Sequence, residues 1–235
     1  MHNADILYMG SNRFHRSLDK GNNFKNLSGD LSNGRKPGDV PFGTITTISE
    51  SPLQFGLLYI GTDDGNIQLS RDGGNNWTQL GKPAKKNPGL PQGLFVSRVV
   101  ASAWKIGRVY VTLNGYRNDH FNAYVFVSDD YGTTWKQLGA DLPLEPVNVL
   151  CEDPVSEKIL YLGTDGGCYA SVNGGGSFMP LQKGLPVSIP VHDIAIQKRE
   201  NEIVLGTHGR SLYIGKLDSV QALLGPTPVS SLKIE

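Results

Sequence analysis

The sequence predicts an all-β fold built from repeated antiparallel hairpins. One eight-residue pattern, Ser-x-Asp/Asn-x-Gly-x-x-Trp/Phe, recurs at residues 17–24, 70–77, 128–135 and 171–178. Short apolar runs rich in β-branched residues flank the copies, and the chain holds 29 glycines and 14 prolines among its 235 residues, which suits a fold dense in turns. We call the recurring pattern the octapeptide. A strand, the octapeptide turn and a second strand together form the predicted hairpin.

The positions that recur in every octapeptide have structural roles in a tight turn. The acidic or amide side chain at the third position accepts hydrogen bonds from turn amides, and the glycine at the fifth permits a positive φ. The aromatic ring at the eighth position is expected to return to the core, where removing a buried ring costs about 3–5 kcal/mol. We therefore interpret the octapeptides as structural rather than catalytic or calcium-binding. Their residues are Ser17, Asp19, Gly21, Phe24, Ser70, Asp72, Gly74, Trp77, Ser128, Asp130, Gly132, Trp135, Ser171, Asn173, Gly175 and Phe178.

The octapeptide resembles the Asp-box, or BNR repeat, of sialidases, sortilin-type receptors, xyloglucanase-like glycoside hydrolases and photosystem assembly factors. This resemblance implies a β-propeller with four-stranded antiparallel blades, in which the box joins the third and fourth strands away from the ligand. Phrases at 7–13, 43–52, 59–65, 191–195 and 206–211 are similar to the C-terminal propeller of large exported bacterial proteins of sortilin-like or glycosyl-hydrolase-like type. The resemblance covers about residues 5–215 and implies an exported protein.

The octapeptides fix the register of the expected strands. These are 6–10, 16–17 and 24–27 in the first unit, 43–52, 57–62, 67–70 and 77–80 in the second, 96–103, 108–113, 123–128 and 135–138 in the third, 147–152, 159–164, 168–171 and 178–181 in the fourth, and 191–197, 202–207 and 211–215 in the last. A short helix is expected at 219–224. We expect blades over 1–215 and a C-terminal tail over 216–235.

The two end units are incomplete, because the first lacks its innermost strand and the last lacks its outermost. Exposed strand edges invite pairing with other chains. The sequence therefore predicts an open arc of about five repeats that is part of a larger propeller, with self-association or docking to the rest of that propeller. A permuted, closed five-blade ring is the alternative.

Composition narrows the classes of function. The formal net charge is zero, whereas nucleic-acid binding calls for a basic patch or stripe. No apolar run approaches the roughly 20 residues of a membrane span, and residues 1–8 do not resemble a signal peptide. Cys151 and Cys168 are expected two strands apart, about 9.6 Å, which is too far for a disulfide. The histidines lack metal-ligand spacing, so neither a metal nor a cofactor is expected.

Candidate ligand contacts lie on the loops that join second and third strands, a face that usually binds ligands in propellers. The longest such loop, 114–122, offers Tyr116, Arg117 and His120 for stacking and charged hydrogen bonds; the alternative is a solvated hairpin. His208 and Arg210 flank Gly209 in the last unit. Arginine suits a carboxylate or phosphate and histidine can move a proton, unless Arg210 pairs with a neighbouring carboxylate such as Asp193 or Asp165.

Carboxylates and a further arginine occupy comparable loops. Asp63 and Asp165 are weak catalytic candidates, because most glycosidases use two carboxylates, and Asp64 is a candidate ligand contact. The same residues are also ordinary turn formers. Arg13, Arg117 and Arg210 resemble the arginine clamp of sialidases, but the Arg-Ile-Pro phrase is missing and no Tyr-Glu pair can be assigned.

Three functions remain open at this point. The first is a non-catalytic binding or scaffold module that holds a protein, peptide or glycan on its loop face. The second is part of a xyloglucanase-like glycoside hydrolase, and the third is a sorting or assembly factor for exported proteins. We favour the binding module, because no catalytic set can be assembled from these residues.

Overall fold

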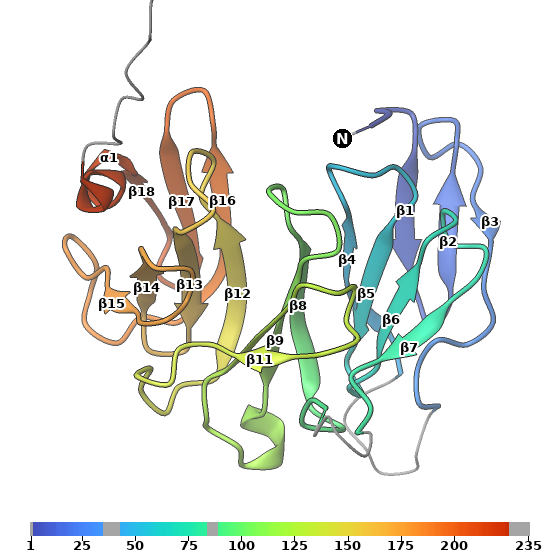
Figure 1. The fold of residues 1–235 in the computed structure, drawn as a ribbon, viewed down its shortest axis with the longest axis horizontal. Helices are drawn as coiled ribbons and strands as arrows, with labels where there is room; N and C mark the ends of the chain where they lie inside the picture. The colour runs from blue at the N-terminus through green and yellow to red at the C-terminus, as the bar shows by residue number, and fades with distance from the viewer. Residues whose placement is uncertain (1, 35–42, 84–88, 226–235) are drawn as a thin grey trace, which may run out of the picture.

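The computed structural model describes residues 2–34, 43–83 and 89–225, and these form five antiparallel sheets that follow one another in chain order (Figure 1). We call the sheets blades 1 to 5. Their strands are β1 (Leu7–Gly10), β2 (Phe14–Ser17) and β3 (Lys25–Asn26); β4 (Ile45–Glu50), β5 (Leu58–Thr62), β6 (Ile67–Ser70) and β7 (Thr78–Leu80); β8 (Phe95–Ala101), β9 (Val109–Asn114), β10 (Tyr124–Ser128) and β11 (Lys136–Gln137); β12 (Val147–Glu152), β13 (Leu160–Thr164), β14 (Cys168–Ser171) and β15 (Met179–Pro180); and β16 (Val191–Gln197), β17 (Glu202–Thr207) and β18 (Leu212–Lys216).

The strand order confirms the expected division into units of three, four, four, four and three strands. β6, β12, β14, β16 and β17 have the expected bounds. The fourth strands are shorter than expected, because the octapeptide's aromatic residue lies outside the ladder and, except in β7, so does the leucine three residues later. The helix expected at 219–224 is a single turn, α1 (Asp218–Gln221), followed by the 3-10 turn η2 (Ala222–Leu224). Residues 226–235 of the expected tail lie outside the described residues.

The blades form an open arc, not a ring. The inner strands β4, β8, β12 and β16 contact one another in sequence, whereas blades 1 and 5 lie at opposite ends of the row (Figure 1). The closed five-blade ring is therefore wrong. We call the side of a blade that faces the preceding blade its leading face, and the side that faces the next blade its trailing face.

The core is pooled between blades, as expected for stacked sheets whose faces are both apolar. Phe14 and Ile60 meet between blades 1 and 2, and Tyr59 and Val99 between blades 2 and 3. Further clusters fill the interface of blades 3 and 4 and that of blades 4 and 5. Among the described residues, no helix is long and apolar enough to cross a membrane.

Each octapeptide forms the same hydrogen-bonded turn between a third strand and the residues that follow it. In blade 2 the Ser70 hydroxyl donates to Asp72 Oδ1 (2.9 Å), and the Gly74 and Asn76 amides donate to Ser70 Oγ (2.8 Å) and Asp72 Oδ1 (2.9 Å). Hydrogen bonds from the Asn76 side chain and amide hold the pKa of Asp72 at about 2. These carboxylates are occupied by their own turns, which supports the structural interpretation.

In blades 2, 3 and 4 the octapeptide also ties its blade to the preceding one. A Cβ added to Gly74 would collide with the Phe14 ring of blade 1, and one added to Gly175 would lie 2.7 Å from Leu138 Cδ1 of blade 3. The Trp77 ring meets Phe14 edge-on with centroids 5.0 Å apart. The turn therefore works as a clasp between neighbouring blades, and only glycine fits at its point of closest approach.

The expectation of buried octapeptide rings needs a correction. Trp77, Trp135 and Phe178 are only half-buried, and Phe24 is 41% exposed. The half-buried rings pack on a preceding blade. Phe24 belongs to blade 1, and no preceding blade covers it among the described residues.

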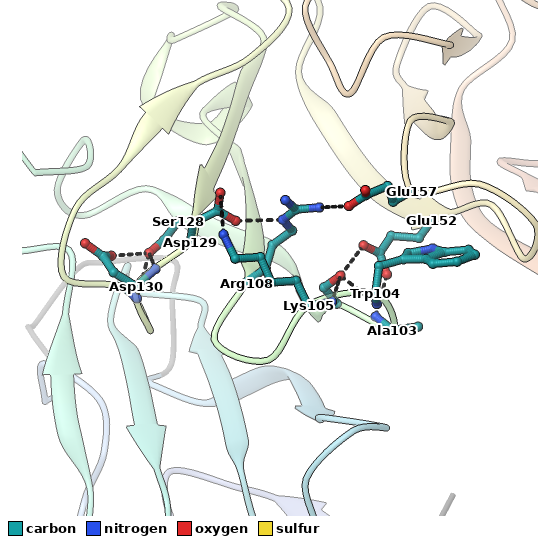
Figure 2. Close-up of polar contacts among 11 residues, drawn as sticks. Ala103, Trp104, Lys105, Arg108, Ser128, Asp129, Asp130, Glu152 and Glu157 are labelled. Carbon is teal, nitrogen blue, oxygen red and sulfur yellow. Dashed lines mark hydrogen bonds and ion pairs between the residues drawn. The ribbon is translucent and has the colours of Figure 1, made fainter. Parts of the chain in front are cut away.

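Polar contacts add to the apolar ones between blades 3 and 4 (Figure 2). Arg108 donates from Nε to Asp129 Oδ1 (2.6 Å) in its own blade and from Nη1 to Glu157 Oε2 (2.9 Å) in the next. The Ala103 amide donates to Glu152 Oε2 (2.7 Å), and burial raises the pKa of Glu152. Cys151 and Cys168 are free, as expected.

Candidate functional site

A β-bulge near the start of each inner strand shapes the surface at the loop end of the blades. The register slips by one residue between Ile45 and Thr47, and equivalent slips occur in β8, β12 and β16. A bulge leaves one residue outside the ladder and turns its side chain away from the regular pattern. The bulged residues are Thr46, Ser97, Asn148 and His192.

The bulged side chains link neighbouring inner strands. The hydroxyls of Thr46 and Ser97 donate to carbonyls near the start of the next inner strands, Val96 O and Val147 O, each at 2.7 Å. Asn148 Nδ2 donates in the same way, to Val191 O at 3.3 Å. His192 holds this position in blade 5, where its ring lies 5.2 Å from that of His208.

A cavity of about 570 Å³ opens where Asn148 and His192 approach the loops of blades 3, 4 and 5. We call it the rim pocket. It lies at the loop end of the blades, since the antiparallel strand order places the octapeptides at the other end of each sheet. Its lining residues are Phe95, Asn114, Tyr116, Arg117, Asn148, Asp165, Pro190, His192 and His208.

A chain of hydrogen bonds fixes the polar wall of the rim pocket. Asn114 Nδ2 donates to Asn148 Oδ1 (2.8 Å), and Asn148 Nδ2 donates to Asp165 Oδ1 (2.8 Å). Both ends of the Asn148 amide are thereby oriented, and the Asp165 carboxylate is held in place. A preorganised polar wall of this kind loses little side-chain entropy when a ligand binds.

Aromatic and cationic groups make up the other walls. The 3-10 turn η1 (Tyr116–Asn118) carries Tyr116, which is 62% exposed, and Arg117, whose guanidinium lies 5.5 Å from the centre of the Phe95 ring. Tyr116 also meets Phe121 edge-on, with centroids 5.9 Å apart. Flat rings beside a guanidinium suit ligands that both stack and carry an anionic or hydrogen-bonding group.

Four of the candidates from sequence line the rim pocket together. Tyr116 and Arg117 come from the long loop of blade 3, Asp165 from blade 4 and His208 from blade 5. The loops share one face of the arc, and the structure brings these side chains around one cavity. Their roles as ligand contacts remain a proposal.

The other candidates lie outside this cavity. Asp63 is buried and accepts the Thr44 amide at 2.7 Å, whereas Asp64 accepts the Asn33 amide at 2.7 Å. Both carboxylates hold neighbouring loops in place. His120 lies 3.4 Å from the Tyr124 hydroxyl.

Arg13 and Arg210 are exposed and do not line the rim pocket. The carboxylate of Asp193, considered as a partner for Arg210, pairs with Arg98 instead. The three arginines therefore do not gather into one clamp.

Sequence reasoning missed Phe95, Asn114, Asn148, Pro190 and His192 as site residues. A signal was present for Asn148 and His192, because a polar residue follows a valine or isoleucine near the start of each inner strand. That repetition is recognisable once the octapeptides have set the register of the units.

The described residues that line the rim pocket do not include a pair of carboxylates. Among the described residues that line it, Asp165 is the one carboxylate, and that side chain is held by Asn148. No group of three or more His, Cys, Asp or Glu able to hold a metal occurs among the described residues.

The sequence matches no known protein family and no curated protein. The fold of this chain is similar to parts of several solved structures. An ancestral GH74 enzyme superposes with a TM-score of 0.63 at 16% identity, over 87% of this chain and 26% of that one. The GH74 xyloglucanase from Xanthomonas campestris gives 0.66 at 12%, over 92% and 35%.

The extracellular domain of a hybrid two-component system from B. thetaiotaomicron gives 0.59 at 16%, over 91% and 25%. At these identities the likeness shows the fold alone, which is that of β-propeller proteins. The chain spans about a quarter to a third of the length of these structures.

Proposed function

We propose that this chain is a non-catalytic binding or scaffold module of an exported, sortilin-like BNR-repeat protein, and that it holds a protein, peptide or glycan in the rim pocket. The observation that best supports this proposal is the cavity of about 570 Å³ in which Tyr116, Arg117 and Asn148 converge from two blades. Similarity to an extracellular domain is in keeping with an exported protein.

The groups in the rim pocket define the ligand's chemistry. Tyr116 and Phe95 offer ring faces for a sugar or an aromatic side chain, and Arg117 offers a fork of donors to a carboxylate. The amides of Asn114 and Asn148 add fixed donors and acceptors. A carboxylate-bearing peptide or glycan uses all three.

The alternative is that the chain is part of a xyloglucanase-like glycoside hydrolase. Its fold is similar to that of GH74 structures, which is in keeping with this alternative. Hydrolysis requires two carboxylates that flank one glycosidic bond. Asp165 is in the rim pocket, but Asp63 is buried in blade 2 against Thr44. A second carboxylate would have to come from outside the residues that line the rim pocket.

The test is a titration of the ¹⁵N-labelled chain with xyloglucan oligosaccharides and with short acidic peptides. Saturable shifts at Tyr116, Arg117 and Asn148 are expected from one of the two panels. Arg117→Gln should weaken that binding at least tenfold, corresponding to about 1.4 kcal/mol. Arg210→Gln is the matched control, because Arg210 is equally charged and lies outside the cavity.

Either of two results overturns this proposal. One is an absence of saturable shifts in the rim pocket with both panels, and the other is an equal effect of the two arginine variants. Hydrolysis of a polysaccharide that disappears in Asp165→Asn would replace binding with the glycosidase alternative.

We further propose that the free ends of the arc dock to a second copy, head to tail. Leu7 and Met9 are exposed on the leading face of blade 1, and Leu212 and Ile214 on the trailing face of blade 5. Inside the arc, faces of these two kinds pack on each other at every blade boundary. An end-to-end contact therefore continues an interface that the chain already uses.

A further inference from the structure

The fourth strands share a pattern that extends beyond the octapeptide. Each reads aromatic-x-x-Leu, at residues 24–27, 77–80, 135–138 and 178–181. The leucine lies opposite the first residue of the third strand, or opposite the second residue in blade 3. Its amide donates to that residue's carbonyl, as in Leu138 to Val125 (2.9 Å) and Leu181 to Cys168 (2.7 Å).

The aromatic residue and the leucine stabilise opposite faces of one blade. Trp77 packs in the cluster between blades 1 and 2, whereas Leu80 packs in the cluster between blades 2 and 3. Phe178 and Leu181 divide in the same way between the two interfaces of blade 4. A fourth strand therefore joins its own blade to both neighbours.

Blade 5 has no fourth strand among the described residues, so the outer edge of β18 is unpaired there. The register identifies the equivalent positions. Leu212 pairs with Gly206 as Ile67 pairs with Gly61, and Gly215 pairs with Ile203 as Ser70 pairs with Leu58. An added strand would place its leucine opposite Leu212 and its aromatic ring beside Gly215.

A cavity of about 270 Å³ lies at that ring position. A Cβ added to Gly215 would meet only Ile203 Cγ2, at 3.6 Å, so the space above this residue is open. Ile214 of β18 lines the cavity, and the other apolar side chains that line it belong to the cluster between blades 4 and 5. They are Leu181, Leu185, Ile203, Leu205, Tyr213, Leu217 and Val220.

We propose that this groove binds an extended segment of a separate polypeptide with the spacing aromatic-x-x-Leu. The segment adds to β18 as an antiparallel fourth strand, with its ring in the cavity and its leucine on the trailing face. Addition of a strand to a free sheet edge is a general mode of peptide recognition, in which backbone bonds give affinity and side-chain pockets give specificity. The site is independent of the rim pocket.

The probe is a peptide that copies residues 74–82, Gly-Asn-Asn-Trp-Thr-Gln-Leu-Gly-Lys, added to the full chain. Hydrogen exchange is expected to slow at the amides of β18, and the Leu212–Lys216 signals are expected to shift saturably. Peptides with alanine in place of the tryptophan or of the leucine should bind at least tenfold more weakly, since buried aromatic anchors dominate such interfaces.

Two protein variants make the test specific. Gly215→Leu fills the cavity from the protein side and should abolish peptide binding with no loss of thermal stability. Leu53→Ser removes an exposed apolar side chain of blade 2, outside the cavity, and should keep binding within about threefold. Slow exchange without a difference between the peptides, or a Gly215→Leu chain that binds normally, would overturn the proposal.

Discussion

At the scale of single residues, Asp72 and Asn173 hold the same position in two octapeptides, and only the first carries a charge. Both accept a serine hydroxyl and a turn amide through Oδ1. The charge changes the pH dependence of the turn but not its geometry. Hydrogen bonds from Ser17 and Asn23 likewise hold the pKa of Asp19 at about 2.

These depressed pKa values predict a loss of stability in acid. The pKa of Asp72 in the folded chain is about 2, below its ordinary value of 3.8. The hydrogen bonds of the turn therefore stabilise the ionised carboxylate, and this stabilisation adds to the free energy of unfolding. The contribution is complete above about pH 4 and disappears as the pH falls toward 2. Urea midpoints measured from pH 6 to pH 2 should fall less steeply for Asp72→Asn than for the parent chain. Parallel curves would contradict this role.

The octapeptide rings should contribute differently to the free energy of unfolding, depending on whether a preceding blade packs against them. Trp77 packs on Phe14 and donates from Nε1 to Gly74 O (2.9 Å), whereas Phe24 is exposed. Trp77→Ala should lower the free energy of unfolding by about 3 kcal/mol, the lower end of the range for a large ring. Phe24→Ala should cost no more than about 0.5 kcal/mol. Equal losses of unfolding free energy in the two variants, measured by urea denaturation, would contradict the packing of the ring on the preceding blade.

At the scale of elements, the clasp depends on two adjacent glycines that do different work. Gly174 and Gly175 both have positive φ, at 71° and 86°. A Cβ on Gly174 meets nothing within 4 Å, whereas one on Gly175 lies 2.7 Å from Leu138 Cδ1 in the preceding blade. Substitution at these two positions separates backbone strain from packing between blades.

Alanine at either glycine should cost about 1 kcal/mol for the left-handed backbone. Gly175→Ala should lose a further 1–3 kcal/mol or so, because the added methyl group forces Leu138 and the blade boundary apart. Chemical denaturation of the two single variants measures the difference directly. If both variants lose the same amount, the octapeptide does not hold neighbouring blades together.

The strands were predictable because the octapeptide repeats and sets the register. β12, β16 and β17 follow from their apolar, β-branched residues and their distance from an octapeptide. The rim pocket was only partly predictable. Asp63 and Asp165 occupy equivalent loops, but the first is buried against Thr44 and the second lines the cavity, a difference set by contacts distant in sequence.

The bulges were also invisible to strand patterning. They shift the alternation by one residue at Asn148 and His192, which turns these polar side chains toward the rim pocket. A regular strand alternation without the bulges would not turn these two side chains toward the rim pocket.

At the scale of the whole molecule, the arc leaves two apolar faces uncovered, the leading face of blade 1 and the trailing face of blade 5. Faces of these two kinds pack against each other at the blade boundaries inside the arc. Sedimentation velocity at rising concentration should show association through these faces. Leu212→Lys together with Ile214→Lys should abolish it, because two charges cannot be buried unpaired. A profile that stays monomeric at high concentration would contradict the end-to-end contact.

The measurement that tests the open arc most directly is cross-linking of a chain that carries Leu7→Cys and Leu212→Cys with a short bifunctional maleimide. The parent chain, whose own cysteines are buried or half-buried, is the control. The open arc predicts no cross-link within one chain at low concentration and cross-links between chains as concentration rises. An efficient cross-link within a single chain would mean that blades 1 and 5 meet in a closed ring, and would contradict the account.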